Sequence, residues 1–166
     1  MTSILVRDLM TVGVATCKTG TSIREAAQFL LDNHLEELVV INSSGEGAGV
    51  CGYEELINVF GSENLSNFTV EAVMREGVPE LPADIPVVTA AQLMKDMGIR
   101  VAYMNHHAAG ITYPAAFISY KHILRCLVAN DPQDLKDLGI AASRKSPMET
   151  FIQRRDEART KASLAG

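Results

Sequence analysis

Apolar residues recur at helical spacing over residues 22–31. The apolar positions are Ile23, Ala26, Ala27, Leu30 and Leu31. This spacing places them on one face of an α-helix, which predicts a helix with one buried side. Ser22 and Glu25 form the S-x-x-E pattern of a capping box, so we expect the helix to begin directly after Ser22.

Shorter elements surround this helix in the first half of the chain. A short extended piece is expected at 14–16, and the run LVVI at 38–41 predicts a buried strand. The segment NSSGEG that follows predicts a turn, and GVCG at 49–52 predicts a second strand. YEELINVF at 53–60 predicts a short helix, which Gly61 is expected to end.

The same order of residues returns after an offset of 64 positions. Matching positions include Val6 and Val70, Met10 and Met74, Val14 and Val78, and the Ala-Ala pairs at 26–27 and 90–91. Beyond the segment NHHAAGITYP the offset becomes 67, so that GVCGYEEL lies over AFISYKHI at 116–123. We place the extra residues in a loop within that segment, where an insertion costs little.

Each copy therefore predicts the order strand, helix, strand, strand, helix. In the second copy Pro86 suits the first helical turn, the strands are 101–104 and 116–119, and the closing helix begins at Tyr120. A unit of about 60 residues buries too little surface to be comfortably stable alone. We therefore expect an α/β (α+β) fold in which two pseudo-symmetric units pack sheet against sheet, with clefts at the strand ends along their seam.

Composition narrows the classes of function. The chain has 166 residues, 47% of them hydrophobic, with a formal net charge of -5 and no Trp. This acidic balance disfavours nucleic-acid binding. The sequence contains no apolar run of about 18 residues, so it predicts no membrane span. The first residues lack the pattern of a signal peptide. Cys17, Cys51 and Cys126 are widely spaced, which indicates reduced thiols and a cytoplasmic location.

The duplicated order resembles a tandem pair of CBS domains (cystathionine beta-synthase domains), often called a Bateman module. The resemblance rests on VRDLMTVGVAT and TVEAVMREGVPEL at the openings, the Ala-Ala helices and the strand-strand-helix endings. It implies two β-α-β-β-α repeats packed through their sheets, at 1–64 and 65–130, followed by a C-terminal helical extension at 131–166. Pairs of this family commonly form flat head-to-head homodimers, so the resemblance also implies a homodimer.

The resemblance implies a ligand site at the end of each copy. Nucleotide-binding members end in Gly-h-h-(Thr/Ser)-x-x-Asp-h, where h is apolar, the Asp accepts from both ribose hydroxyls and the hydroxyl residue helps to hold phosphate. Here Gly52 and Glu55 occupy the hydroxyl and Asp positions in the first copy, and Ser119 and His122 occupy them in the second. A neutral His122 could accept only one bond, so the two sites are unequal.

The resemblance adds Thr16, His34 and Lys121 to the candidate binding residues. Thr16 matches a position that often lines the pocket, His34 matches one where some members carry a basic residue, and Lys121 lies within the second motif. Structural interpretations stay open for the whole set. Glu55 suits a first helical turn, Ser119 suits an N-cap, and a histidine such as His34 suits the end of a helix.

Two other features suggest chemistry but have simpler interpretations. Cys51 lies between two glycines and ahead of two glutamates, yet it occupies an apolar strand position, so we predict a core residue. His106 and His107 are adjacent without a partner at ligand spacing, and we expect no metal site there.

The C-terminal tail differs from the rest of the chain. The pattern SPME at 146–149 predicts a helix start, and the helix is expected to continue to about residue 162. Its first turns carry apolar residues and the remainder is basic. Two interpretations remain: the helix docks by its first turns, or it contacts a second subunit or an acidic partner.

Three functions are compatible with these patterns. The first is a regulatory module that requires no cofactor and binds an adenosine-containing ligand between the copies. AMP is favoured over ATP because few cations lie near the motifs, with ADP and other adenosyl ligands as alternatives. The second is a ligand-free scaffold for homodimerisation and for contact with a regulated protein partner. The third is an enzyme, which we do not expect because the sequence lacks a recognisable catalytic motif.

Overall fold

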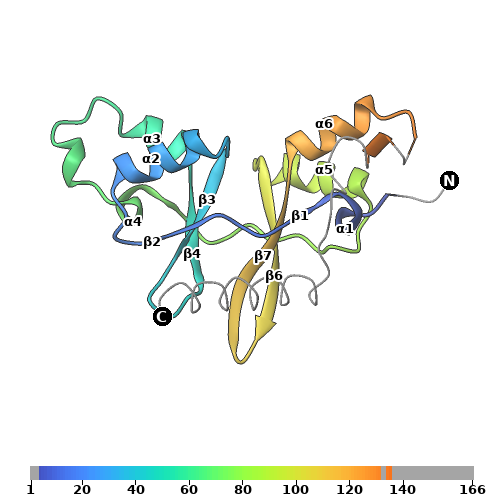
Figure 1. Ribbon diagram of the computed structural model, residues 1–166, viewed down its shortest axis with the longest axis horizontal. Coiled ribbons are helices and arrows are strands. Elements are labelled where there is room, and N and C mark those ends of the chain that lie inside the picture. The colour runs from blue at the N-terminus through green and yellow to red at the C-terminus, as the bar shows by residue number, and fades with distance from the viewer. Residues whose placement is uncertain (1–3, 132–133, 136–166) are drawn as a thin grey trace, which may run out of the picture.

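The computed structural model describes residues 4–131 and 134–135. These residues form two arms that meet at their sheets and diverge toward the helices, as Figure 1 shows. The helix predicted from residue 146 lies outside the described part of the chain. None of the helices in the described part is long and apolar enough to cross a membrane.

The first arm contains a four-stranded sheet with two helices over it. Its elements are β2 (Thr16–Lys18), α2 (Ile23–Asp32), β3 (Glu37–Ile41), β4 (Gly47–Gly52), α3 (Tyr53–Asn58) and a 3-10 turn, η1 (Leu65–Asn67). The strand order is β2-β3-β4-β5, where β5 is Arg75–Glu76, with β2 and β3 parallel and the other pairs antiparallel. The predicted capping box forms, because the Ser22 N–H donates to Glu25 Oε2 at 3.0 Å and the Glu25 N–H donates to Ser22 Oγ at 3.2 Å.

The second arm repeats this plan with a smaller sheet. Its elements are α5 (Val87–Asp96), β6 (Val101–Ala108), β7 (Ile111–Ser119) and α6 (Tyr120–Val128). The strand that would correspond to β2 is reduced to a single bridge between Glu80 and Tyr103. Pro79 and Pro82 flank this position, and proline has no N–H to donate to a strand ladder.

The segment NHHAAGITYP forms strands rather than the predicted loop. β6 and β7 pair continuously from Val101 opposite Ser119 to Ala108 opposite Ile111. The reversal occurs at Ala109 and Gly110, which both adopt a positive φ. The extra residues of the second copy therefore lengthen a hairpin. The register shift at Met104/Asn105 is present in both copies, because the first copy has one at the equivalent Val40/Ile41.

The opening segments of the two copies are exchanged between the arms. The first segment holds α1 (Val6–Leu9) and β1 (Thr11–Val12), and β1 pairs with β7 of the second arm. The second segment holds α4 (Val70–Val73) and β5 (Arg75–Glu76), and β5 pairs with β4 of the first arm. Figure 1 shows both segments passing from one arm to the other. Each arm therefore completes its sheet with a strand from the other copy.

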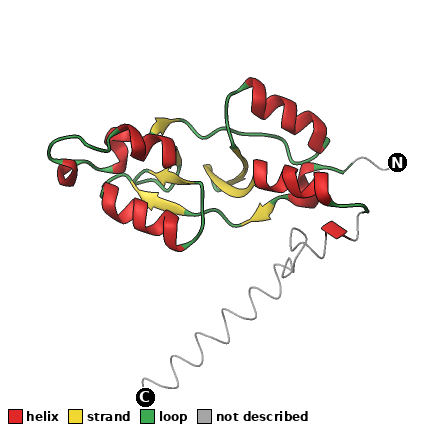
Figure 2. Cartoon of the chain, turned by 90° about the horizontal axis from the view of Figure 1, so that it is seen from above, coloured by secondary structure: helices red, strands yellow, loops and turns green. Residues whose placement is uncertain are grey.

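The two sheets pack against each other along a seam between the arms, as predicted. Val39 and Val50 of the first sheet share a buried cluster with Val101 and Tyr103 of the second. Each arm also has its own core beneath its helices, centred on Leu30 and Leu38 in one and on Met94 and Ile118 in the other. Seen from above in Figure 2, the helices form two groups, one over each arm. The mixed α/β class predicted from the repeat is confirmed.

Candidate functional site

Two pockets open at the seam, one beside the N-terminus of each closing helix. The α6 pocket, which includes Ser119 and His122, encloses about 170 Å³. The α3 pocket, which includes Gly52 and Glu55, encloses about 40 Å³. The repeat offset relates these residue pairs, so the pockets are equivalent positions that have become unequal in size. Small-molecule pockets typically span about 300–1,000 Å³. Both pockets are smaller than this, and the α6 pocket is the roomier of the two.

The α6 pocket has apolar walls supplied by both arms. The wall residues are Val14, Ala15, Leu35, Val101, Tyr103 and Phe117. Planar rings and branched side chains of this kind form flat apolar surfaces, which suit a heteroaromatic ring. The polar residues lie around this wall, so the pocket has the general form of a small-molecule site.

His122 closes one side of the α6 pocket as a neutral imidazole. The Ser119 backbone N–H donates to its Nδ1 at 3.1 Å, and the Ser119 hydroxyl lies 2.9 Å from the same nitrogen. Because a backbone N–H can only donate, Nδ1 accepts and the ring proton lies on Nε2, which donates to Thr11 Oγ1 at 2.9 Å. His122 therefore caps the N-terminus of α6 and ties it to the exchanged strand β1.

Burial opposes protonation of this histidine. Only 6% of His122 is exposed, and this burial, together with the nearby cations Arg125 and Lys121, lowers its pKa from 6.5 to about 4. A second proton on Nδ1 would also point at the Ser119 N–H, which is itself a donor. His122 is consequently uncharged at neutral pH.

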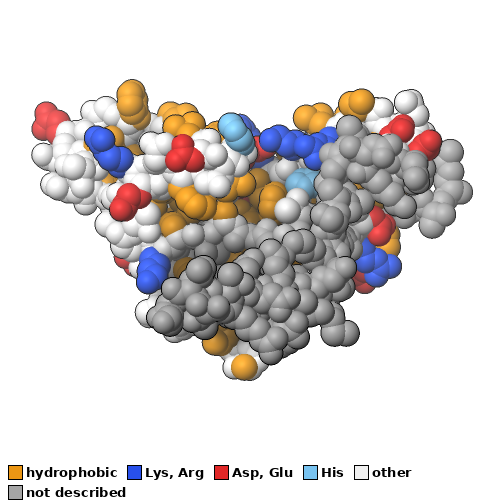
Figure 3. Space-filling model, in the orientation of Figure 1, with side chains coloured by type: hydrophobic (Ala, Val, Ile, Leu, Met, Phe, Trp, Pro, Cys, Tyr) orange, Lys and Arg blue, Asp and Glu red, His pale blue; other side chains and the backbone are white. Residues whose placement is uncertain are grey.

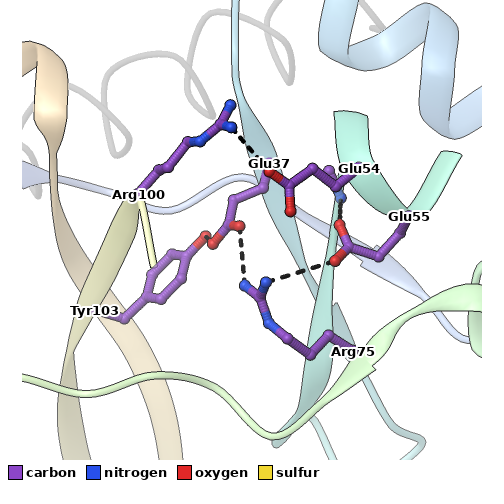
Figure 4. Close-up of polar contacts among 7 residues, drawn as sticks. Glu37, Glu54, Glu55, Arg75, Arg100 and Tyr103 are labelled. Carbon is purple, nitrogen blue, oxygen red and sulfur yellow. Dashed lines mark hydrogen bonds and ion pairs between the residues drawn. The ribbon is translucent and has the colours of Figure 1, made fainter. Parts of the chain in front are cut away.

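The α3 pocket is filled by side chains of the chain itself, as Figure 4 shows. Arg75 lies between two carboxylates, 3.3 Å from Glu37 Oε2 and 3.5 Å from Glu55 Oε1. Tyr103 donates its hydroxyl to Glu37 Oε1 at 2.9 Å, and the Gly52 N–H donates to Glu55 Oε2 at 2.9 Å. Both carboxylates thus have partners within the protein, and the Arg75 guanidinium occupies the space between them.

Glu37 is the buried centre of this network and faces both pockets. Its side chain is 9% exposed, and burial raises its pKa even though the Tyr103 hydroxyl and Arg75 act in the opposite direction. The buried Tyr103 hydroxyl has a raised pKa, first because of burial and then because of Glu37. Because Glu37 lines the α6 pocket as well as the α3 pocket, it connects the two.

The missing hydroxyl at Gly52 has a steric cause. A methyl group added to Gly52 would lie 2.7 Å from the carbonyl oxygen of Glu36 and 2.7 Å from Cβ of Glu37. The backbone φ of Gly52 is -136°, which any residue adopts. The close approach of the Glu36–Glu37 backbone, rather than a special conformation, is therefore what requires glycine here.

The charges around the α6 pocket nearly balance. His34, Lys121 and Arg125 lie on its rim, as do Glu36 and Glu37. Figure 3 shows histidine and basic side chains beside the hollow between the arms. A lining with both signs of charge suits a ligand of low or mixed charge better than a triphosphate.

His34 has a strained backbone at the rim of the α6 pocket. Its φ is +53°, a left-handed conformation that disfavours side chains other than glycine. The repeat-related residue in the second arm is Gly98, with a φ of +65°. Strain that one copy avoids and the other retains is typical of functional positions.

The structure divides the predicted binding residues into three groups. His34, Ser119, Lys121 and His122 lie together at the α6 pocket. Gly52 and Glu55 lie together at the α3 pocket. Thr16 lines neither pocket; it is exposed on β2, where it pairs with Val39.

Sequence reasoning missed Thr11, Arg75, Glu37 and Tyr103. Thr11 and Arg75 are the residues after the matched methionines Met10 and Met74, so the repeat itself marked them as equivalent. Their contacts with His122 and Glu55 depend on the exchange of opening segments between the arms. Glu37 and Tyr103 carried no comparable signal, because each resembles an ordinary strand residue.

The cysteine and the histidine pair behave as structural residues. Cys51 is fully buried in the first core, as predicted, and burial raises its pKa to about 12, so the thiol remains protonated. His107 Nδ1 lies 2.7 Å from Thr112 Oγ1, and the His106 ring packs edge-on against Tyr113. Within residues 4–131 and 134–135, no three His, Cys, Asp or Glu side chains are grouped to hold a metal ion.

A family model and solved structures agree on the class of protein. Residues 6–62 match the model of the CBS domain. No curated protein matches the chain. The first copy matches the CBS-domain model, and the described residues have the fold of solved CBS-domain pairs, in agreement with the resemblance noted in the sequence.

Three solved structures illustrate the similarity. The CBS domain pair of protein MJ0100, in complex with 5'-methylthioadenosine and S-adenosyl-L-methionine, is 20% identical with a TM-score of 0.67, covering 78% of this chain and 99% of that one. The CBS-domain protein ATU1752 from Agrobacterium tumefaciens is 22% identical with a TM-score of 0.65, covering 74% and 92%. The CBS domain of a bacterial CNNM/CorC family Mg2+ transporter, in complex with ATP, is 16% identical with a TM-score of 0.60, covering 75% and 87%.

Proposed function

We propose that this chain is a regulatory module that binds one small adenosyl ligand in the α6 pocket. The observation that carries the proposal is the inequality of the pockets, one open with apolar walls and the other filled by Arg75. The adenine ring would pack between the apolar residues of the two arms. The ribose or its substituent would lie near Ser119 at the N-terminus of α6, where helix N–H groups favour polar and anionic groups.

The ligand should carry less negative charge than a triphosphate. Lys121, Arg125 and His34 favour an anion, but Glu36 and Glu37 offset them. We therefore favour AMP, 5'-methylthioadenosine or S-adenosylmethionine over ATP. The related structures support this chemistry, because CBS pairs have been solved with methylthioadenosine and S-adenosylmethionine and a CBS domain with ATP.

Ligand binding would be reported through packing. The α6 pocket takes its walls from both arms, so an occupant contacts both at once and resists their separation. Through Glu37 and Tyr103 it would also touch the network in the α3 pocket. A change in how the arms meet would alter the surfaces available to a second copy of the chain or to a regulated protein partner.

A thermal-shift screen tests the proposal. AMP, ADP, ATP, methylthioadenosine and S-adenosylmethionine are added separately at concentrations up to the millimolar range. We expect at least one of the small ligands to raise Tm, because a ligand that binds only the folded state stabilises it by mass action. Ser119→Ala should reduce the shift, whereas Glu55→Ala in the α3 pocket should leave it. No shift with any compound would contradict the proposal.

The alternative is a ligand-free scaffold that acts through protein contacts. Its support is that Glu55 and His122, at the positions of the family's ribose-binding Asp, already bond to Arg75 and Thr11 within the chain. Under this alternative the chain would associate with itself or a partner with an affinity that none of the five compounds changes.

A further inference from the structure

The charged residues that line the α6 pocket are sorted by arm. Both lining carboxylates, Glu36 and Glu37, belong to the first arm. Both lining cations other than histidine, Lys121 and Arg125, belong to α6 of the second arm. A ligand that spans the pocket therefore meets acidic groups on one side and basic groups on the other.

A directed chain of hydrogen bonds runs along the basic side of the pocket. The Ser119 backbone N–H donates to His122 Nδ1 at 3.1 Å, so that nitrogen carries no proton. The proton on Nε2 then points to Thr11 Oγ1 at 2.9 Å. The Thr11 oxygen accepts this bond, and its own hydroxyl proton is left to donate. Because Thr11 lines the pocket and is exposed, it can donate that proton to a ligand.

His122 has no acceptor left for a ligand. A neutral imidazole has one acceptor nitrogen, and the Ser119 N–H occupies it. The single bond that the sequence analysis allowed this histidine to accept is therefore already made within the chain. Its remaining polar atom, the protonated Nε2, can only donate. The imidazole and the Thr11 hydroxyl thus favour an acceptor on the ligand, and a ribose hydroxyl that needs to donate gains nothing from Nε2.

Two cations strengthen this preference for an acceptor. Lys121 and Arg125 are one helical turn apart on α6, which places them on the same side of the helix. Both lie close enough to the His122 ring to lower its pKa. An anion beside them is stabilised, whereas an anion beside Glu36 and Glu37 is repelled. The acceptor that fits the second arm is therefore negatively charged.

We propose that the ligand of the α6 pocket is an adenosine whose ribose carries a phosphate on its 2' or 3' oxygen. This inference rests on the proposed function, in which the ribose lies near Ser119. The side chain of His122 lies 2.9 Å from the Ser119 hydroxyl, so the donors meet groups attached directly to the ribose ring. A 5'-phosphate is held one carbon further from the ring.

A phosphate at this position satisfies every group described on the second arm. Its oxygens can accept the Thr11 hydroxyl proton while Thr11 still accepts from His122, so the chain of hydrogen bonds stays intact. Its charge lies beside Lys121 and Arg125. The base at the other end of the ligand lies toward the first arm, where an amino group can donate to a carboxylate but a phosphate would be repelled.

Calorimetry with four probes tests the position of the phosphate. Adenosine, 2'-AMP, 3'-AMP and 5'-AMP are titrated separately into the full chain at one ionic strength. We expect 2'-AMP or 3'-AMP to bind at least about tenfold more tightly than adenosine and 5'-AMP, because hydrogen bonds to a charged group are the strong ones. The 5' isomer has the same charge and composition, so it controls for non-specific attraction of an anion.

Two substitutions test the residues that would hold the phosphate. Thr11→Val removes the hydroxyl at nearly constant shape, and Lys121→Met removes the charge at similar length. Each should weaken the preferred isomer at least about fivefold and leave adenosine within about twofold. Thr11→Ser retains the hydroxyl and should retain the preference. Lys95→Met removes an exposed cation from α5, outside the pocket, and should change neither affinity.

The outcomes separate this inference from the proposed function. The inference is overturned if 5'-AMP binds as tightly as the other two isomers, or if Thr11→Val and Lys121→Met weaken adenosine as much as the preferred isomer. It is also overturned if methylthioadenosine or S-adenosylmethionine binds and no AMP isomer does; in all three cases the adenosyl function stands. Absence of binding by every adenosyl compound contradicts the proposed function, and the inference with it.

Discussion

Protonation of His122 should weaken the fold in mild acid. The folded-state pKa of this imidazole is about 4, below the ordinary value of 6.5, because the ring is buried and lies near Arg125 and Lys121. A group whose pKa is lowered by folding stabilises the folded state above its ordinary pKa. That stabilisation is then lost as the pH falls toward the folded-state value. The relevant window is therefore between about pH 6.5 and pH 4.

The size of the effect follows from the shift. The imidazole has a pKa of 6.5 in the unfolded chain and about 4 in the folded protein. This difference lowers the free energy of unfolding by about 2 kcal/mol at pH 5 and by about 3 kcal/mol at pH 4. Because 6% of the residue is exposed, little of this should be screened by solvent. A domain of this size typically has about 5–15 kcal/mol in total, so the loss is measurable.

His122→Gln is the matched variant for this measurement. Glutamine at the third helical position can accept from the Ser119 N–H, as in a capping box, but does not titrate. Urea unfolding of both proteins at several pH values between 7.5 and 4 gives the difference in free energy of unfolding, in which the other titrating groups largely cancel. We expect the wild type to lose about 2–3 kcal/mol relative to the variant across this window. A difference that stays constant with pH would refute the buried neutral imidazole.

Three further changes test the seam between the arms. Glu37→Gln removes a carboxylate whose pKa is raised by burial. In urea unfolding, the variant should therefore gain stability relative to the wild type as the pH rises from about 4.5 to 8. A difference in the free energy of unfolding that does not change with pH would contradict this. Gly52→Ser should cost about 1–3 kcal/mol in the same assay because of the Glu36 carbonyl, whereas Gly20→Ala, where a methyl group meets nothing within 4 Å, should change stability by less than about 0.5 kcal/mol. His34→Gly should raise the free energy of unfolding by about 1 kcal/mol, because glycine tolerates the positive φ. The same variant should bind the adenosyl ligand more weakly in calorimetry. A loss of stability would show that contacts of the His34 side chain compensate for its backbone strain.

Local patterns predicted the main elements because each depends on residues close in sequence. The helix after Ser22 followed from its apolar spacing and from the pairing of Ser22 with Glu25, and the structure contains both. The exchange of residues 5–12 and 69–76 between the arms could not be predicted from such local patterns. Helices of four residues and strands of two carry too few positions to show a period, and their partners are distant in sequence.

The sequence predicted the positions of the two candidate pockets but not the contacts within them. The repeat placed Ser119 and His122 at one position and Gly52 and Glu55 at the other, and the structure has a pocket at each. The sequence could not show that Arg75 fills the second pocket, because its contact with Glu55 exists only after the strand exchange. It also could not show why Gly52 lacks a side chain, since the obstruction comes from Glu36 and Glu37 at the start of β3.

The two pockets differ in the contacts that surround them. At the α3 pocket, the Tyr103–Glu37 hydrogen bond and the Arg100–Glu54 ion pair connect the arms, and Arg75 binds Glu37 and Glu55 within the first arm. At the α6 pocket, Thr11 of the exchanged strand β1 bonds to His122 within the second arm. A ligand in the α6 pocket would contact residues of both arms on that side of the seam.

Isothermal titration calorimetry with the strongest ligand of the screen tests the central claim most directly. We predict one binding site per chain, with affinity at least about fivefold weaker in Lys121→Ala and unchanged in Glu54→Ala, because a charged contact is worth about 1 kcal/mol or more. Lys121 and Glu54 are repeat-related residues on the rims of the α6 and α3 pockets. Two sites per chain, or equal loss of affinity in both variants, would contradict the account.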